Sequence, residues 1–358
     1  MTTGFLQRLG LPHPIIQAPM AGVSTPAMAA AVSRAGALGS IGVGAVDAAS
    51  ARGMIAAIRA ATEAPFNVNL FCHRPAVANP AKEAAWLDRL RPTFAAFGAQ
   101  PPATLREIYR SFLADPEMLA MLVAEAPAVV SFHFGLPPAA VIAALKDAGI
   151  VLLASATSLA EGQAAVAAGV DAVVAQGWEA GGHRGMFDPD APDERLPALD
   201  LTRRLAADLP VPVIAAGGIM DGAGIAAALA AGAVAAQLGT AFVLSPESAA
   251  DAGYRTALAE AARRSTAMTR VISGRPARCL GNRFTALAAD VPDDAVPAYP
   301  IAYDAGKALH AAAVARGDYG YGAQWAGTGA AKARPLGSAA LVEALAAELA
   351  VARAADKP

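Results

Sequence analysis

The chain has 358 residues, 55% of them hydrophobic, and a formal net charge of -2 at pH 7. This length can bury a large core, which favours an enzyme-sized body over a small binding module. The nearly balanced charge and the lack of a basic tract argue against nucleic acid or a membrane surface as partner, so we expect small-molecule partners. Two distant cysteines and an N-terminus without a secretory pattern predict a cytoplasmic protein. The apolar stretch 223–244 is broken by glycines, which predicts a buried helix and strand and no membrane span.

Short apolar runs alternate with alanine-rich segments of helical period. Such runs predict parallel strands that are covered on both faces and joined by crossover helices. Their number suits a closed (β/α)8 TIM barrel, an α/β fold, although an open doubly wound sheet has the same local pattern. In chain order the runs are Ile15–Met20, Leu38–Gly44, Phe66–Phe71, Ala128–Gly135, Val151–Ala156, Ala172–Gly177, Val211–Gly218 and Ala233–Phe242. The clearest helices between them are Pro26–Ala35, Pro138–Ala148 and Leu159–Ala168.

Two segments interrupt this alternation. Residues 76–122 and 246–304 are too long for single crossovers, and we expect them to form a second, smaller, mostly helical lid and substrate domain. Residues 1–75, 123–245 and 305–358 then form the barrel. Within the last of these, Ser338–Ala354 is amphipathic and is expected to be the final barrel helix, displaced in sequence.

Glycines lie at the ends of the seventh and eighth runs. Gly217 and Gly218 end one run, and Gln237, Leu238, Gly239 and Thr240 end the next. Loops after the last two strands of a TIM barrel commonly bind phosphate, because the missing Cβ atoms let backbone N–H groups approach the anion. The alternative is that these glycines only make tight turns.

The stretch AQGWEAGGHRG, residues 175–185, follows the sixth run. Further glycines there allow another close approach of the backbone, and amide side chains at other strand ends can address a flat, uncharged ring. A phosphate at one end and neutral hydrogen-bonding groups at the other suit flavin mononucleotide, FMN. The residues expected at the ring are Ala21, Gly22, Asn69 and Gln176, while Gly181 and Gly182 supply the close backbone approach next to His183.

Several longer motifs together resemble the class I nitronate monooxygenase family. They cover most of the chain and are specific as a set, whereas each glycine pair alone is a weak signal. The motifs are PIIQAPMAGVSTP (14–26), FNVNLFCHRP (66–75), VSFHFGLP (130–137), QGWEAGGHRG (176–185), AAGGIMDG (215–222), QLGTAF (237–242) and SGRPAR (273–278).

The resemblance implies a TIM barrel with a smaller lid domain, a tightly held FMN, and oxidation of alkyl nitronates by O2 without a nicotinamide cofactor. It gives His183 the role of the catalytic histidine and His133 that of a second active-site histidine. Ala21 and Trp178 occupy positions that vary in the family. The flavin-binding positions carried over are Gly22, Asn69, Gln176, Gly181, Gly218 and 237–240.

Histidine is chemically suited to this reaction. Its ordinary pKa near 6.5 lets His183 act as a base toward carbon or, when charged, hold an anionic nitronate. The alternative is a hydrogen-bonded structural histidine, and for His133 the flanking Phe132 and Phe134 make a core position an equal alternative. The other histidines have no metal-like spacing, so we expect no metal site.

Tyr303 and Lys307 are four residues apart, on one face of a predicted helix. The resemblance implies that they and further tyrosines line the substrate pocket and receive the carboxylate of propionate 3-nitronate. The alternative is a surface lysine over packed tyrosines. The further tyrosines are Tyr109, Tyr254 and Tyr299. The turn Ser273–Arg275 holds the lid or the phosphate, or is a turn with a structural arginine.

The predicted activity is therefore FMN-dependent oxidation of nitronates by O2 to a carbonyl compound and nitrite, which detoxifies nitro compounds, in a monomer or homodimer. Another possibility on the same fold is an NAD(P)H-dependent flavin reductase acting on enoyl-acyl carrier protein or quinones. A non-catalytic flavin or phosphate binder and a lyase or isomerase barrel are the remaining alternatives.

Overall fold

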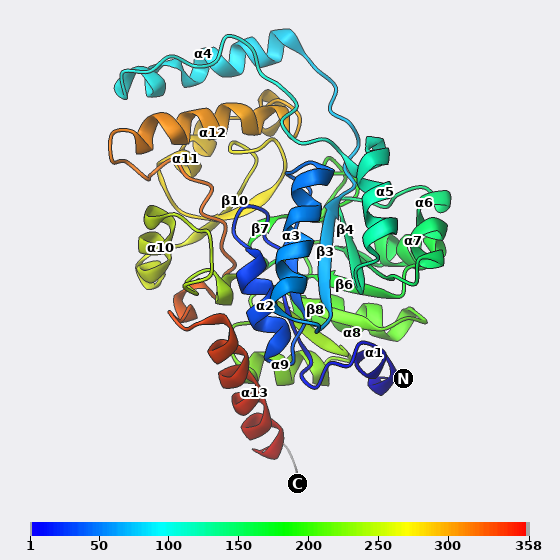
Figure 1. Ribbon diagram of the computed structural model, residues 1–358. Helices are drawn as coiled ribbons and strands as arrows, with labels where there is room; N and C mark the ends of the chain where they lie inside the picture. Colours follow the sequence, from blue (N-terminus) through cyan, green and yellow to red (C-terminus); the bar gives the residue numbers. More distant parts are fainter. Residues whose placement is uncertain (1, 356–358) are drawn as a thin grey trace.

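Eight parallel strands form the centre of the computed structural model, which describes residues 2–355 (Figure 1). Their order is β1-β9-β8-β6-β5-β4-β3-β2, and a parallel bridge between Ile16 and Leu38 joins the two ends. The predicted TIM barrel is thereby confirmed. The strands are β1 (Ile15–Gln17), β2 (Gly39–Gly42), β3 (Phe66–Phe71), β4 (Val129–His133), β5 (Val151–Ala156), β6 (Ala172–Gln176), β8 (Val213–Ala216) and β9 (Ala235–Leu238).

The helices around the barrel begin at well-formed N-caps. The Thr25 side chain accepts a hydrogen bond from the backbone of α2, and Asp47 and Asp221 do the same for α3 and α9. Helix α13 packs against α9 and α2, so the predicted displaced barrel helix is confirmed. The helices of the barrel part of the chain are α1 (Thr2–Arg8), α2 (Pro26–Arg34), α3 (Ala48–Ala61), α5 (Pro116–Glu125), α6 (Ala139–Asp147), α7 (Leu159–Ala168), α8 (Ala198–Asp208), α9 (Gly222–Ala230) and α13 (Ser338–Ala355).

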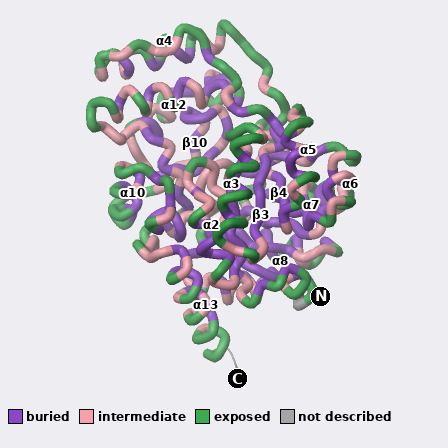
Figure 2. Tube along the Cα trace, viewed as in Figure 1, coloured by how far each residue is buried: buried purple, intermediate pink, exposed green. Residues whose placement is uncertain are grey.

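The barrel strands are buried on both faces, which explains their continuous apolar runs (Figure 2). All six residues of β5 are buried. Ile16, Leu153 and Ile214 belong to one apolar cluster, while Val68 and Leu152 belong to a second cluster that includes residues of α3 and α8. This double packing fixes the strands whose ends carry the site.

A second layer lies beyond one end of the barrel. Helices α4 (Pro80–Ala96) and α12 (Ile301–Val314) pack together there, with Trp86, Phe94 and Leu309 in a shared apolar cluster (Figure 1). The layer also holds α10 (Ala252–Ala259), α11 (Arg283–Ala286) and an antiparallel sheet in the order β10-β11-β7, formed by β10 (Thr266–Thr269), β11 (Ala277–Leu280) and β7 (Gly182–His183). This sheet was not predicted, because its strands are very short and lack apolar alternation. None of the helices within residues 2–355 is long and apolar enough to cross a membrane.

Candidate active site at the carboxyl ends of the barrel strands

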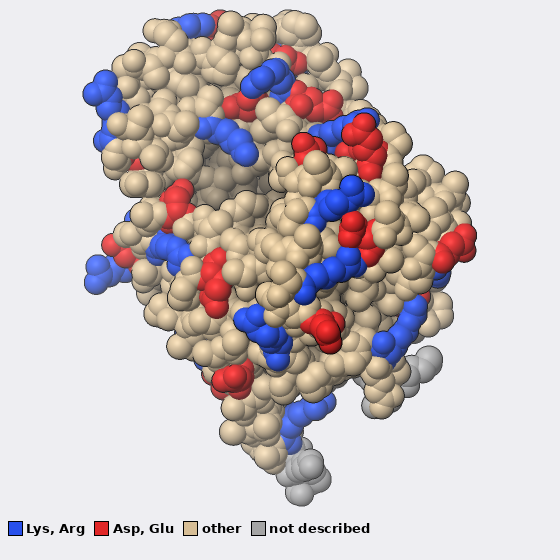
Figure 3. Space-filling view, in the orientation of Figure 1, with Lys and Arg blue, Asp and Glu red and all other residues tan. Residues whose placement is uncertain are grey.

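A pocket lies where the barrel strands end, beneath the layer that contains α12. The molecule is hollowed between that layer and the barrel on the face shown in Figure 3. The pocket lining holds no Asp, Glu, Lys or Arg. Its lining residues include Met20, Ala21, Asn69, Tyr109, His133, Gln176, Gly181, Gly182, His183, Gly217, Gly218, Gln237, Gly239, Thr240, Tyr254, Tyr299, Tyr303 and Trp325.

Three predicted site residues lie outside this lining. The Leu238 side chain is 1% exposed in the apolar core, and its carbonyl accepts a hydrogen bond from the Ala18 N–H. Gly22 lies in the exposed turn after β1, with a φ of 76°. Lys307 is exposed on α12, with its Nζ 5.0 Å from the centroid of the Tyr109 ring. All other predicted site residues are brought together in the pocket.

The glycines at three strand ends present free backbone donors. Among the described residues, no hydrogen-bond acceptor is paired with the N–H groups of Gly181, Gly217, Gly218, Gly239 or Thr240. Gly217 and Gly218 have φ values of 127° and 70°, which side chains rarely adopt. A Cβ on Gly181 would lie 2.4 Å from a backbone nitrogen of the facing loop. These features together make a cradle for an anion such as a phosphate.

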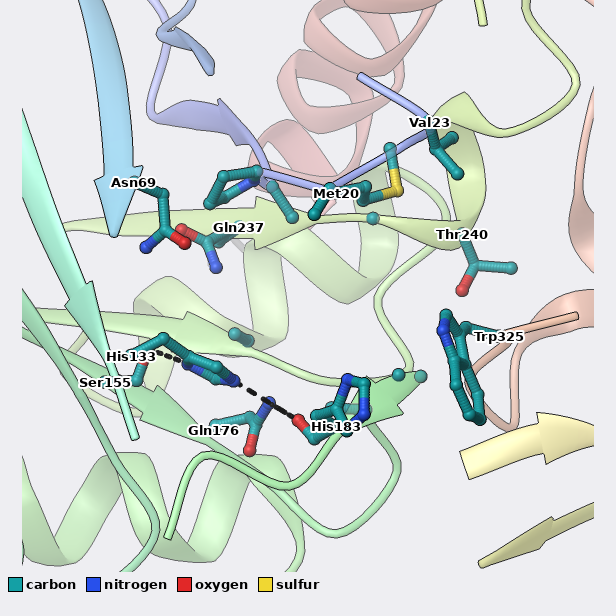
Figure 4. A pocket seen from close by; sticks show the side chains of 18 of the residues that line it. Met20, Val23, Asn69, His133, Ser155, Gln176, His183, Gln237, Thr240 and Trp325 are labelled. Carbon is teal, nitrogen blue, oxygen red and sulfur yellow. Dashed lines mark hydrogen bonds between the residues drawn. The ribbon is translucent and has the colours of Figure 1, made fainter. Parts of the chain in front are cut away.

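Two walls of amide and imidazole groups face each other across the pocket. Asn69 and Gln237 lie on one side, and His133, Gln176 and His183 on the other (Figure 4). The Asn69 amide donates to the Ser131 hydroxyl at 2.9 Å, whereas the Gln237 amide has no partner among the described residues. The space between the walls suits a flat ring with hydrogen-bonding edges.

His183 is held at both its backbone and its ring. Its carbonyl accepts hydrogen bonds from Gln176 Nε2 at 3.0 Å and from His133 Nε2 at 3.3 Å, and its Nε2 lies 2.9 Å from the Ser273 hydroxyl. Burial, and after it the nearby His133 and Arg275, lower the pKa of His183 to about 3. The imidazole is therefore neutral at physiological pH.

Both ring nitrogens of His133 are engaged. Nδ1 lies 3.0 Å from the Ser155 hydroxyl, and Nε2 contacts the carbonyl of His183, which can only accept (Figure 4). His133 is therefore protonated at Nε2, and Ser155 donates to Nδ1. Burial lowers the pKa of His133 to about 4, with Arg275 as the second cause.

A buried arginine lies behind the pocket wall. Arg275 is 3% exposed, donates to the Met186 carbonyl and forms no ion pair with a described carboxylate. Its guanidinium lies 4.3 Å from the centroid of Phe134, which has an unusual φ of 73°. A buried positive charge beside a pocket without carboxylates makes the site favourable for an anion.

Aromatic rings form the outer part of the pocket. The Tyr299 and Trp325 rings lie 5.3 and 5.1 Å from that of His183, and Tyr303 lies 5.8 Å from Tyr109. The Tyr254 hydroxyl donates to the Trp325 carbonyl, and burial raises the pKa of the tyrosines that line the pocket. Sequence reasoning missed Trp325, which follows α12 in a loop without a motif of its own. It also missed Ser155, since a serine at a strand end carries no distinctive signal.

The fold and this site define a TIM-barrel enzyme whose pocket, at the carboxyl ends of the strands, is lined by glycines, amides and a neutral histidine. Within residues 2–355, no three His, Cys, Asp or Glu side chains are arranged to hold a metal ion.

The chain belongs to the nitronate monooxygenase family, whose model matches residues 5–348. A nitronate monooxygenase of Paraburkholderia phytofirmans is 63% identical over 344 residues, covering 96% of this chain and 94% of that protein. One from Pseudomonas aeruginosa is 56% identical, covering 98% and 99% of the two chains. The protein is accordingly an oxidoreductase, and its substrates are small molecules, the nitronates. Enzymes of this family depend in general on a flavin.

Two solved structures are similar over nearly the whole chain. A nitroalkane oxidase from Streptomyces ansochromogenes superposes with a TM-score of 0.88 at 41% identity, covering 98% of this chain and 99% of that chain. The structure of FabK from Thermotoga maritima is less similar, with a TM-score of 0.72, 29% identity, and coverage of 98% and 96%.

Proposed function

We propose that the pocket binds FMN with its phosphate on the backbone N–H groups at the ends of β6, β8 and β9. The observation that supports this placement is the set of unpaired backbone donors at glycines, of which Gly217 and Gly218 have a φ that side chains rarely adopt and Gly181 packs tightly against the facing loop. The isoalloxazine ring then lies between the amide wall of Asn69 and Gln237 and the histidine wall. When bound, FMN supplies the electron acceptor for the nitronate.

The substrate we propose is an alkyl nitronate, and the observation that carries this is the charge pattern of the pocket. The lining contains no carboxylate to repel an anion, and the buried charge of Arg275 lies behind Phe134. Neutral His183 can accept a proton from a neutral nitroalkane, whereas a preformed nitronate needs no such transfer. The products are a carbonyl compound and nitrite, with O2 as oxidant, so the activity removes toxic nitro compounds.

His133 and Gln176 hold the histidine in place in this proposal. Both ring nitrogens of His133 are already engaged, and the Gln176 amide bridges the His183 carbonyl and the Gly185 N–H. A group with no free lone pair is poorly suited to take a proton. We therefore assign proton transfer to His183 alone and a positioning role to His133.

The outer pocket is proposed to select nitronates that carry a carboxylate, such as propionate 3-nitronate. Lys307 Nζ lies 5.0 and 5.6 Å from the ring centroids of Tyr109 and Tyr303, which line the pocket. Tyr254 and Tyr299 complete the aromatic lining. An ammonium at the pocket edge can hold a carboxylate by a charge-assisted hydrogen bond. We propose that the layer around α4 and α12 acts as the lid domain that carries this lysine.

The test is an absorbance spectrum of the purified protein, identification of the released flavin by chromatography, and oxygen consumption with propionate 3-nitronate. We expect a flavin spectrum, FMN in stoichiometric amount, and nitrite formed as O2 disappears. A colourless protein, or FAD as the released flavin, would overturn the cofactor assignment.

Mixing with NADH under anaerobic conditions tests the reductase alternative. We expect the flavin to stay oxidised with NADH and to be reduced by the nitronate. Rapid bleaching by NADH without nitronate turnover would instead make the protein a reductase.

We further propose a cytoplasmic monomer or homodimer. Both cysteines, Cys72 and Cys279, are free and buried, which suits a reducing compartment. Light scattering coupled to size-exclusion chromatography distinguishes the two oligomeric states.

A further inference from the structure

We infer that Ser273 is a positioning residue that sets the tautomer of His183. Its hydroxyl keeps the proton on Nε2 and leaves Nδ1 as the basic atom that faces the pocket. The inference rests on the proposed role of His183 and deepens it, because it names the atom that takes the proton. Ser273 lies in the turn before β11, outside the pocket lining.

The Ser273 hydroxyl contacts two groups at once. It is 0% exposed, lies 2.9 Å from His183 Nε2, and donates to the Arg275 carbonyl at 3.3 Å. A hydroxyl has one proton and two lone pairs. If that proton goes to the Arg275 carbonyl, His183 Nε2 must be the donor in the shorter contact.

The Arg275 carbonyl decides the direction of the shorter hydrogen bond. Among the described residues, its only hydrogen-bond donor is the Ser273 hydroxyl. Were Ser273 to donate to His183 instead, this carbonyl would be left unpaired beside a buried arginine. Leaving a buried acceptor unpaired is costly, so the arrangement that satisfies both groups is favoured. Nε2 therefore carries the ring proton.

The other ring nitrogen is left available. His183 Nδ1 makes no hydrogen bond to a described residue and is not among the buried atoms without a partner, so it is open to the pocket that His183 lines. The main chain is fixed independently, by the hydrogen bonds from Gln176 and His133 and by pairing of His183 with Ala277 of β11. Ser273 is thus the only described hydrogen-bond partner of the ring.

This arrangement predicts which step depends on Ser273. Proton removal from a neutral nitroalkane needs the lone pair on Nδ1, whereas a preformed nitronate has no carbon proton to lose. Ser273→Ala frees the ring to take the other tautomer. We expect kcat/KM for a neutral nitroalkane to fall on the order of ten-fold, less than the full general-base contribution of roughly 10²–10⁴-fold because the base itself is kept. For the matching nitronate we expect less than about a two-fold change, since general-base catalysis contributes nothing there.

The control variant is Ser245→Ala. Ser245 is also 0% exposed, but its hydroxyl has no partner among the described residues. We expect both substrates to be turned over as in the unmodified protein. Equal losses on both substrates in Ser273→Ala, with normal flavin content, would show a general structural role and overturn the inference. Ser273→Cys, which keeps a weak donor and acceptor, is expected to restore part of the activity toward the nitroalkane.

A direct measurement needs no loss of function. The chain has five histidines, so nitrogen-15 NMR of labelled holoenzyme can resolve His183, assigned by the signal lost in His183→Asn. We expect Nε2 to be protonated and Nδ1 unprotonated, and a mixture in Ser273→Ala. A proton on Nδ1 in the unmodified protein would overturn the inference. Full nitroalkane activity in His183→Asn would instead overturn the proposed role of His183, whatever the tautomer.

Discussion

Replacement of Lys307 by methionine tests how the outer pocket selects its substrate. The ammonium lies 5.0 and 5.6 Å from the ring centroids of Tyr109 and Tyr303. Lys307 is therefore at the edge of the pocket, and it is still exposed to water. A hydrogen bond to a charged group contributes about 1.5–3 kcal/mol, and water screening at an exposed position favours the lower end. At about 1.4 kcal/mol per ten-fold, Lys307→Met should lower kcat/KM for propionate 3-nitronate about ten-fold.

The assay compares propionate 3-nitronate with an uncharged nitronate of similar length, by oxygen consumption. The loss should be confined to the carboxylated substrate, and Lys307→Arg should recover most of it because the charge is kept. Lys146→Met, which removes an exposed lysine from α6, is the matched control and should change neither value. A parallel fall on both substrates would refute the reasoning and assign Lys307 to the fold or the flavin. No change on either would make it a solvated surface residue.

Three further predictions concern the inner site. His183→Asn should keep the flavin and lower turnover of a neutral nitroalkane by about 10²–10⁴-fold, with a smaller loss of turnover on the nitronate. Equal losses on the two substrates would mean that the imidazole holds the anion. Gly239→Ala should weaken flavin retention without unfolding the protein, since the nearest atom would lie 3.4 Å from the new Cβ. The control is Gly53→Ala on α3, where no atom lies within 4 Å of the new Cβ. Full flavin content in Gly239→Ala would argue against the phosphate site. A third histidine, His73, is buried near the ring of Phe134 and lies outside the pocket lining. The pKa values of His73, His133 and His183 are lowered to about 4, 4 and 3 in the folded state, so between pH 6.5 and 4 only the unfolded chain binds these protons. The free energy of unfolding, measured with urea, should therefore fall with decreasing pH in that window by up to about 1.4 kcal/mol per unit for each histidine, and a constant value would contradict their burial as neutral groups.

The barrel was predictable from the sequence because its strands are buried on both faces. That burial makes each strand a continuous apolar run, and β5 is the clearest case. The strand ends were predictable for the same reason, since Gly217 and Gly218 stand where an apolar run stops and His183 lies in the glycine-rich loop that follows another. The roles of these residues remain predictions.

The outer wall of the site was only partly predictable. Trp325 and Ser155 reach the pocket through the fold, and neither stands in a pattern that indicates a site. The strand pairing of His183 with Ala277 joins segments far apart in sequence, and each strand is too short to show a period. The turn at Ser273 was singled out with alternative roles, and its contact with His183 was visible only once these segments were brought together.

Helix α13 completes the ring of barrel helices although the whole second layer precedes it in the chain. It packs between α9 and α2, and Glu348 accepts a hydrogen bond from the Gly222 N–H at the start of α9. During synthesis the strands emerge from the ribosome long before this helix does. Met28, Val32 and Ile225 share an apolar cluster with Leu341, Leu345 and other residues of α13, so this flank of the barrel stays uncovered until α13 has been synthesised. Apolar surface that is exposed in an incomplete fold favours aggregation.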